Sequence, residues 1–297
     1  MKWFCCSDIH GFYDELIQAL TDAGFESTNQ DHGIIVCGDI FDRGKQPLKV
    51  YEFLKSLPKE RRILIRGNHE FLLRDLVKRG YALSHDVHNG TEDTLCYIAN
   101  IITDSEYNQK QIIELTKNKN IDELLRTDTN YDKLEKRRRK KYNNRKIKEI
   151  LKWIASDEWI NYYETNNYIF VHSFIPLRPR QNLKFSELFS TPNEYDPDWR
   201  NVPQFIWEEA TWGCPWQLYL NYFEPEIRNG KILVCGHWHA SDFWNHLDFK
   251  DTPELQLDTA GENPLYKSEK YPNIIGLDAC TVRSHRINVL VLDDEDM

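Results

Sequence analysis

The chain has 297 residues, of which 40% are hydrophobic and 29% are charged, and its formal net charge is -9. This hydrophobic content excludes disorder over the whole chain, and the negative charge argues against general binding to nucleic acid or to anionic membranes. The sequence has no apolar run near the roughly 18 residues of a membrane-spanning helix and no signal-peptide core at the N-terminus. Its seven cysteines lack paired spacing, so we expect a cytoplasmic protein with reduced thiols.

Residues 2–80 alternate short apolar runs with amphipathic stretches. Leu16, Leu20 and Ala23 fall on one face of the first amphipathic stretch, and Gly80 closes the last one. Because strands alternate with helices, we expect a largely parallel sheet in an α/β fold. In chain order, the pattern predicts a strand at 2–8, a helix at 12–25, a strand at 33–39, a helix at 47–57, a strand at 61–70 and a helix at 70–80.

Two later segments depart from this pattern, and neither carries a motif that we can match to a family. Residues 81–160 are polar with mostly helical spacing, and their basic run KRRRKK at 136–141 is interpreted as a solvated helix face rather than a docking patch for phosphate-rich partners. No linker rich in Gly, Ser or Pro divides the chain. We therefore expect one domain, 1–297, with a helical insertion at 81–160 and a loop-rich, aromatic-rich cap at 178–230.

The aromatic side chains of the 178–230 segment have two interpretations. Packing within the cap is favoured, because aromatic rings bury large apolar areas. Alternatively, the rings wall a substrate groove or stack on a nucleobase. The residues concerned are Trp199, Phe205, Trp207, Trp212, Trp216 and Tyr219.

Strand patterns return at 168–173, 231–239, 273–280 and 286–294, and five of the strand candidates are followed by Asp, Asn or His. In open α/β sheets the carboxyl ends of the strands form the ligand crevice, so we expect residues far apart in the sequence to meet there. The motifs are Asp8-x-His10, Gly38-Asp39-x-x-Asp42-Arg43-Gly44, Gly67-Asn68-His69-Glu70, His172 and Gly236-His237-x-His239.

The mixture of imidazole and carboxylate groups predicts a site for divalent ions such as Mn²⁺, Fe²⁺ and Zn²⁺, rather than for Mg²⁺ or Ca²⁺. The candidate ligands are too many for one tetrahedral ion, but they suit two ions about 3.5–4 Å apart that share a carboxylate. Glycines precede Asp39, Asn68 and His237, as expected where the backbone must approach the ions closely.

Taken together, these motifs resemble those of calcineurin-like metallophosphoesterases, over residues 2–80, about 160–175 and 231–292. The forms GDIFDRG at 38–44 and GNHE at 67–70 are similar to the serine/threonine phosphoprotein phosphatase branch, which includes bacterial symmetrical dinucleoside tetraphosphatases. The resemblance implies an α/β fold of four layers, a βαββα sandwich in which helices flank two central sheets.

The resemblance also implies two divalent metal ions, with manganese favoured over iron, zinc or nickel. One ion would have ligands of its own from the first and last motifs, and the other from the third, fourth and last. The implied ligands are Asp8, His10 and His239 for the first ion, Asn68, His172 and His237 for the second, and Asp39 as the bridge between them.

The same resemblance implies catalytic and substrate-binding roles. Asp42 would orient His69, which would protonate the leaving oxygen, and imidazole suits this because it titrates near neutral pH. Arg43 would clamp phosphate oxygens with its planar guanidinium. Asn68 and His69 would also contact the substrate.

The sequence departs from the phosphatase branch at three points. The fourth motif reads His172-Ser173-Phe174 instead of His-Ala-Gly or His-Gly-Gly, and the last motif has a second histidine, His239. A further phosphate-binding arginine has no clear position, and Arg178, Arg180 and Arg200 are its candidates. The chemistry is therefore expected to carry over more closely than the substrate class.

We expect a phosphoesterase that hydrolyses phosphomonoesters through a hydroxide bridging two metals, similar to protein serine/threonine phosphatases. Its partner would be a phosphorylated substrate, either a phosphoprotein or a nucleotide. A dinucleoside tetraphosphatase is the main alternative. A nuclease of the wider superfamily is favoured by His239 but disfavoured by Arg43 and the negative charge, and a non-catalytic binding module is disfavoured because no motif ligand is missing.

Overall fold

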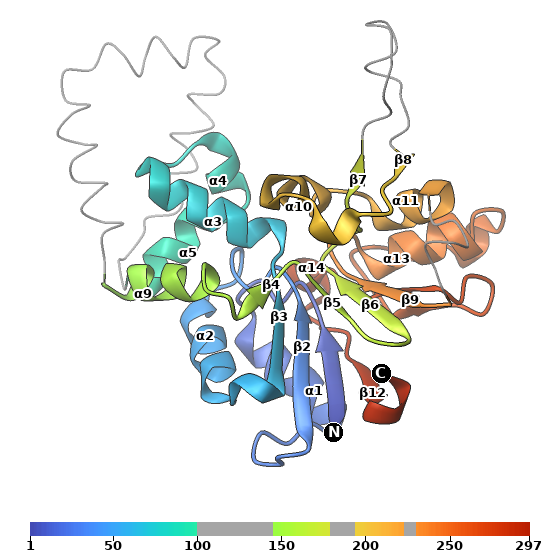
Figure 1. Cartoon of the computed structure of the whole chain (residues 1–297), viewed down its shortest axis with the longest axis horizontal. Coiled ribbons are helices and arrows are strands. Elements are labelled where there is room, and N and C mark those ends of the chain that lie inside the picture. Colours follow the sequence, from blue (N-terminus) through green and yellow to red (C-terminus); the bar gives the residue numbers. More distant parts are fainter. Residues whose placement is uncertain (100–144, 179–193, 223–229) are drawn as a thin grey trace, which may run out of the picture.

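The computed structural model describes residues 1–99, 145–178, 194–222 and 230–297. Two five-stranded sheets dominate this part of the chain, and Figure 1 shows helices on the outer side of each. No described helix combines the length and the apolar character that crossing a membrane requires. The predicted basic run at 136–141 and the candidate Arg180 lie outside the described residues.

The first sheet has the strand order β12-β1-β2-β3-β4. Four of its strands are parallel and β12 is antiparallel, so the predicted parallel character holds for this sheet. Cys6 at the end of β1 pairs with Val36, and Cys37 at the end of β2 pairs with Ile65, so these strands end nearly level. The bounds are β1 Lys2–Cys6, β2 His32–Cys37, β3 Arg62–Ile65, β4 Trp159–Ile160 and β12 Leu290–Asp293.

The second sheet has the order β10-β11-β9-β6-β5. Its three central strands are parallel, and β10 and β5 flank them in antiparallel orientation. The strands β7 (Leu177–Arg178) and β8 (Glu194–Tyr195) form a separate short pair. The bounds are β5 Tyr162–Glu164, β6 Tyr168–Val171, β9 Ile232–Cys235, β10 Tyr266–Lys267 and β11 Ile274–Gly276.

Helices cover the outer face of the first sheet because each presents apolar residues at helical spacing. In α1, Leu16 and Leu20 are buried against the sheet, and in α9 Ile147, Ile150 and Ile154 are buried in the same cluster. The helix α3 ends where Gly80 takes a left-handed φ of 78°, as the sequence predicted. The bounds are α1 Tyr13–Asp22, α2 Pro47–Ser56, α3 Asn68–Arg79, α4 Ser84–His88, α5 Thr91–Ile98 and α9 Arg145–Ile154.

The outer face of the second sheet packs against residues of the predicted cap and of the C-terminal third. Trp199, Trp207 and Tyr219 share one core with Ile169 and Leu233 of the sheet. The helices here are α10 Gln204–Ala210, α11 Pro215–Tyr222, α13 Ala240–Phe243 and, near the first sheet's motifs, α14 Thr281–Ser284. Short 3-10 turns span Lys59–Arg61, Trp199–Asn201, Pro253–Leu255 and Asp294–Asp296, and one π-helical turn spans Trp244–Asp248.

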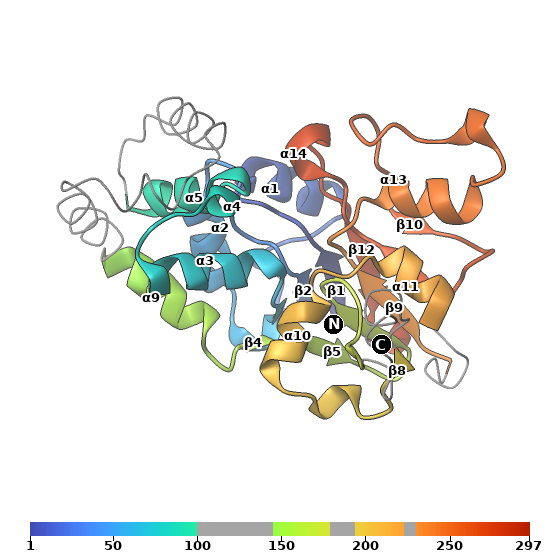
Figure 2. The same cartoon turned by 90° about the horizontal axis from the view of Figure 1, so that it is seen from above.

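A third apolar core lies between the two sheets. It joins Cys5 and Ile35 of the first sheet to Phe170, Val234 and Ile275 of the second, and all five are fully buried or nearly so. The order of layers is therefore helix, sheet, sheet, helix, which Figure 2 shows from above. This arrangement confirms the predicted α/β sandwich of two central sheets flanked by helices.

Candidate metal centre and active site

The predicted motifs lie where strands of both sheets end at the same edge of the molecule. Several hydrogen bonds connect the sheets there, and two of them involve backbone atoms of the motif loops. The ring nitrogen Nδ1 of His172, which follows β6, lies 2.8 Å from the carbonyl oxygen of Cys37 at the end of β2. The backbone amide of His237, which follows β9, donates to Asp8 Oδ2 at 2.9 Å. Residues from both sheets thus form one site.

The loops that carry the motifs turn sharply, and glycines allow their close approach. A Cβ atom at Gly67 would collide with the carboxylate of Asp39, and one at Gly236 would collide with that of Asp8. Several motif residues that do carry side chains have left-handed backbone angles, which persist only where the surrounding structure enforces them. In the described chain, positive φ values from 49° to 72° occur at Asp8, His10, Asp39, Asp42, Arg43 and His237.

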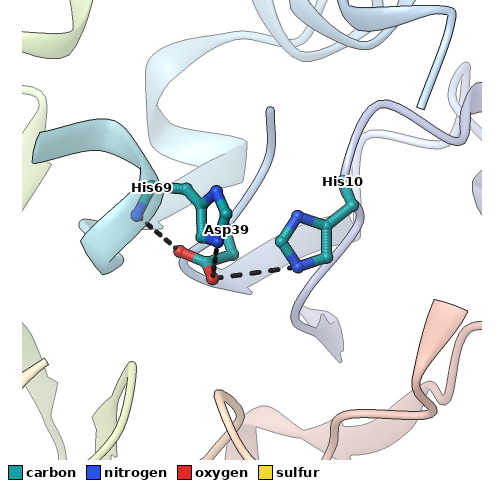
Figure 3. Close-up of side chains that lie close together, drawn as sticks. All are labelled: His10, Asp39 and His69. Atoms are coloured by element: carbon teal, nitrogen blue, oxygen red, sulfur yellow. Dashed lines mark hydrogen bonds and ion pairs between the residues drawn. The ribbon is translucent and has the colours of Figure 1, made fainter. Parts of the chain in front are cut away.

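The first group of potential metal ligands consists of His10, Asp39 and His69 (Figure 3). Asp39 Oδ2 lies 3.9 Å from His10 Nε2 and 3.8 Å from His69 Nε2. The other oxygen of Asp39 accepts the backbone amide of His69 at 3.1 Å. All three side chains are buried, so an ion held here would be largely removed from bulk water.

The second group consists of Asp39, His172 and His237, and Asn68 lies beside it. The Nε2 atom of His172 is 2.8 Å from Asn68 Oδ1, 3.2 Å from His237 Nδ1 and 3.4 Å from Asp39 Oδ1. Asp39 therefore belongs to both groups, one through each carboxylate oxygen. This is the position that the sequence assigned to a bridging carboxylate.

The hydrogen bonds of His10 and His172 indicate whether these groups can bind cations. His10 Nδ1 lies 3.0 Å from the carbonyl oxygen of Phe41, and His172 Nδ1 has the Cys37 carbonyl as its partner. Because a carbonyl oxygen only accepts, each Nδ1 donates, and the lone pair of each neutral ring lies on Nε2. In the second group, lone pairs of nitrogen and oxygen thus face one another, which a metal ion would stabilise.

The electrostatics favour neutral imidazoles at His10 and His237 and an ionised carboxylate at Asp39. Burial lowers the pKa of His10 well below its ordinary value, and burial together with His172 lowers the pKa of His237 to about 3. Burial raises the pKa of Asp39, but the surrounding histidines outweigh this effect and hold it below its ordinary value. Deprotonated imidazole and carboxylate are the forms that bind metals.

His69 is oriented by a buried carboxylate. Its Nδ1 lies 2.7 Å from Asp42 Oδ2, and Thr91 Oγ1 donates to the same oxygen at 2.6 Å. Burial lowers the pKa of His69, but Asp39 and Asp42 together outweigh it, so its pKa is raised above its ordinary value. The pair predicted from the sequence is therefore in contact, and the ring favours its protonated form.

The guanidinium of Arg43 lies next to the first group. Its Nη1 is 3.2 Å from His10 Nε2, and its Nη2 is 3.4 Å from His69 Nε2. The residue itself is exposed. Its donors thus lie where solvent and the buried site meet, as a clamp for phosphate oxygens requires.

Glu70 is the last residue of the motif Gly67-Asn68-His69-Glu70, and the sequence predicted no role for it. In the structure, its carboxylate accepts three backbone hydrogen bonds. Its side chain is completely buried. Oε2 accepts the backbone amides of Asp39 at 3.0 Å and Gly67 at 2.8 Å, and Oε1 accepts that of Ile40 at 3.0 Å. Burial and then the charge of Asp39 raise the pKa of Glu70 to about 7. One carboxylate thereby holds together the loops that follow β2 and β3.

Asp8 and His239 belong to neither ligand group found among the described residues. Asp8 is buried, with Oδ1 3.9 Å from His10 Nε2, whereas His239 is one-third exposed and its Nδ1 is 3.5 Å from Asp242 Oδ2. Their predicted roles as ligands of the first metal therefore remain predictions, and Asp8 lies nearer to that position.

Asp278 is a buried carboxylate that the sequence reasoning missed. It follows β11 and is 4% exposed. After burial, its charge is the largest cause of the raised pKa of Asp8, so the two carboxylates are close neighbours. The signal that identified the other motifs, an acid directly after an apolar strand, is also present in IIGLD at 274–278.

The described part of the predicted cap lies against this site. Arg74 of α3 pairs with Glu208 of α10 through two contacts, Nη1–Oε1 at 2.8 Å and Nη2–Oε2 at 2.9 Å. Next to the site, Ser173 Oγ donates to the carbonyl oxygen of Gly213 at 2.8 Å. These contacts attach the segment from α10 to α11 to two motifs. Arg74 connects it to the helix that begins at Asn68, and Ser173 connects it to the loop that carries His172.

The cap aromatics fall into two classes. Trp199, Trp207 and Tyr219 are buried, as expected for packing within the cap, whereas Phe205 and Trp212 are 60% and 51% exposed. Trp216 stacks on the ring of His246, with centroids 4.0 Å apart. The packing interpretation therefore holds for Trp199, Trp207 and Tyr219, and the partly buried Trp216 packs against the same core.

The candidates for a further phosphate-binding arginine lie elsewhere. Arg200 forms two contacts with Glu164, at 2.7 Å and 2.6 Å, and lines a groove of about 780 Å³ along β4 and β5 that includes none of the motif residues. Arg178 ends β7 and is exposed. Neither side chain is placed among the metal-ligand groups.

Comparison with known proteins agrees with this geometry. The sequence profile of the calcineurin-like phosphoesterases matches residues 1–241. The chain belongs to this family, as the motifs predicted.

Individual relatives match over shorter stretches. The symmetrical bis(5'-nucleosyl)-tetraphosphatase of Photorhabdus laumondii is 37% identical over 73 residues, which is 25% of this chain and 26% of that protein. The protein of that name from Coxiella burnetii is 36% identical over 80 residues, or 27% of this chain and 25% of its own length. The matches thus span about a quarter of these relatives.

Among solved structures, a cold-active protein-tyrosine phosphatase from a Shewanella species aligns with 99% of this chain and 75% of its own, at 16% identity and a TM-score of 0.48. A protein serine/threonine phosphatase from Saccharomyces cerevisiae aligns with 98% of this chain and 79% of its own, at 13% identity and a TM-score of 0.43.

Proposed function

We propose that the protein is a hydrolase that cleaves phosphomonoesters with two divalent metal ions. The observation that carries this proposal is the position of Asp39, whose two oxygens face two separate groups of imidazoles. Family membership supports it independently. The contact of His69 with Asp42, at 2.7 Å, and the guanidinium of Arg43 beside the site support catalysis over binding alone.

The residues present fit two ions. His10 and Asp39, with Asp8 nearby, would hold the first ion, while Asn68, His172 and His237 would hold the second with the other oxygen of Asp39. The ions would neutralise charge on the phosphoryl group and lower the pKa of water to near neutrality. Manganese is proposed as the native metal, because imidazole and carboxylate ligands together suit it.

The protein's own residues would supply positioning and proton transfer. Arg43 would bind phosphate oxygens with its two terminal nitrogens, which lie next to His10 and His69. His69 would donate the proton carried on Nε2 to the leaving oxygen, while Asp42 holds Nδ1 and stabilises the charged ring. Donation by a positioned imidazole of raised pKa is effective at neutral pH.

The substrate class is proposed from the motifs. The forms GDIFDRG and GNHE favour a protein serine/threonine phosphatase-like activity on phosphorylated proteins. A second candidate, hydrolysis of dinucleoside tetraphosphates, is supported by the relatives of that name that match part of the chain. We propose a cytoplasmic location for either activity, and one domain over the whole chain.

The test is hydrolysis of p-nitrophenyl phosphate by purified protein in Mn²⁺, Fe²⁺, Zn²⁺ or Ni²⁺. We expect activity that is lost in a chelator and restored by at least one of these ions. A lack of hydrolysis in every ion would refute the proposed function. A panel of a phosphoserine peptide and diadenosine tetraphosphate then separates the two substrate classes by their kcat/KM values.

A further inference from the structure

We propose that Trp212 is a substrate-contacting residue that selects phosphoesters carrying a planar aromatic ring. This inference rests on the proposed function and deepens it. The indole ring of Trp212 stands edge-to-face with the ring of His237, with centroids 6.1 Å apart and an interplanar angle of 86°. His237 belongs to the second metal-ligand group. The indole is therefore next to the position where we expect phosphate to bind.

The exposure of this ring distinguishes it from the other tryptophans of its segment. Trp199 and Trp207 are 1% and 3% exposed and pack around Tyr162, whereas Trp212 is 51% exposed. Covering an indole releases about 25 cal/mol for each Å² of apolar surface that leaves water. The segment thus leaves open the aromatic ring that borders the metal centre, and a ligand ring can cover it.

The segment also holds this indole in place. The backbone amide of Trp212 donates to the carbonyl oxygen of Glu209 at 3.1 Å, which ends α10 in a tight turn. On one side, the hydrogen bond from Ser173 Oγ to Gly213 attaches the turn to the residue that follows His172. On the other side, the Arg74–Glu208 pair attaches α10 to α3, which begins at Asn68. The backbone that carries the ring is therefore fixed relative to the proposed phosphate position.

The relative positions of His69 and Trp212 indicate which part of a substrate reaches the indole. The proton donor His69 belongs to the first ligand group, and Trp212 adjoins the second. Because Asp39 belongs to both groups, a substrate whose scissile oxygen lies at His69 would have to span the site for its ring to reach Trp212. Stacking of a base on an aromatic side chain strengthens binding about 5- to 150-fold, and pairs of aromatic side chains contribute somewhat less. A nucleobase and a tyrosyl ring share this chemistry.

The experiment uses two pairs of substrates that differ by a ring. Adenosine 5'-monophosphate and ribose 5-phosphate differ by the base, and phosphotyrosine and phosphoserine differ by the phenol ring. The ratio of kcat/KM values within each pair is measured for the native protein and for Trp212→Ala, Trp212→Phe and the matched control Phe205→Ala. Phe205 is equally open to solvent but lies near the other end of α10, about 10 Å away along the helix.

We expect Trp212→Ala to lower the ratio of at least one pair about tenfold, and the affected pair identifies the ring. Trp212→Phe should recover most of that ratio, and Phe205→Ala should leave it unchanged. Equal ratios in the native protein and in Trp212→Ala, for both pairs, would overturn the inference.

A binding experiment distinguishes failure of this inference from failure of the proposed function. If no ester is hydrolysed in any metal, the same pairs are compared by calorimetric dissociation constants on the Mn²⁺-loaded protein. A preference for the ring-bearing member that Trp212→Ala abolishes would support the role of the indole without catalysis. Lack of such a preference in the native protein would contradict it.

Discussion

The two sheets contribute to the site in different ways. The motifs after β1, β2 and β3 lie within a network of buried hydrogen bonds, in which Glu70 holds two loops and Asp42 holds His69. The motifs after β6 and β9 supply His172 and His237, and around them lie exposed groups of the cap. We therefore propose that the first sheet supplies the catalytic geometry, whereas the second completes the proposed metal site and borders the substrate.

This difference between the sheets matches how closely their motifs resemble the phosphatase branch. The motifs of the first sheet follow the phosphatase branch closely, while the fourth and last motifs depart from it. Bond making and proton transfer require a fixed arrangement of atoms, so their surroundings tolerate little change. Surfaces that face a substrate are free to vary with its shape. Each prediction below tests one side of this division.

The largest effect is expected for Asp39→Asn, because this carboxylate belongs to both ligand groups. An amide carries no charge and offers one acceptor oxygen instead of two, so both ions should be lost and turnover should fall to background. Metal content by mass spectrometry and p-nitrophenyl phosphate hydrolysis measure this. The exposed Asp14→Asn is the control. Retention of two ions by Asp39→Asn would contradict the bridging role.

The next effect separates proton transfer at His69, beside the first sheet, from metal binding at His172, beside the second. We expect His69→Asn to lower kcat by about 10²–10⁴-fold, the usual contribution of a general acid, while both ions stay bound. His172→Asn should instead lose metal, because its Nε2 faces the ligands of the second group. Loss of one ion in His69→Asn would show that His69 is a ligand in the first group, and loss of both would refute its role as the acid.

A smaller effect is expected for Glu70→Gln. The amide nitrogen would replace one carboxylate oxygen and face backbone N–H groups, so at least one of the three hydrogen bonds from Asp39, Ile40 and Gly67 would break. Residues that position ligands typically change metal affinity 10–100-fold. Calorimetric titration with Mn²⁺ measures this, and the exposed Glu60→Gln is the control. An unchanged affinity would show that the loops hold their shape without this carboxylate.

The sequence predicted the fold and the strand ends that meet at the site because both depend on local patterns. Apolar runs followed by Asp, Asn or His identified five strand ends, and the structure brings residues from all of them to one edge of the molecule. The role of Glu70 was not predictable, because it depends on the course of two backbones. Thr91 was also missed, since its bond to Asp42 joins a helix that carries no motif. Asp278 followed the strand-end rule and was overlooked.

The smallest effect is expected at Arg200, a candidate phosphate-binding residue that pairs with Glu164 of the second sheet. The Arg200 hydrogen bonds lower the pKa of Glu164 from its ordinary 4.5 to about 2. A lowered folded-state pKa stabilises the protein above about pH 4.5, and this stabilisation is lost as the pH falls toward 2. Arg200→Gln should therefore lower the urea midpoint at pH 7 slightly, because both groups are partly exposed.

The difference in midpoint between native protein and Arg200→Gln should shrink when both are measured at pH 3. Hydrolysis at pH 7 tests whether Arg200 also contributes to substrate binding or turnover. Because the guanidinium is paired with Glu164 away from the motif residues, kcat/KM should stay within about twofold of native. A large rise in the KM of Arg200→Gln would instead indicate that Arg200 contacts the substrate.

The left-handed backbone angles at the metal and phosphate residues have a consequence for the whole molecule. Each side chain held at such an angle opposes folding, and glycine at the same position would not. Folding alone would therefore favour glycine at Arg43, which is exposed and has a φ of 64°. We therefore expect the protein to be less stable than its fold allows, and a variant that gains resistance to heat at these positions should lose the proposed reaction.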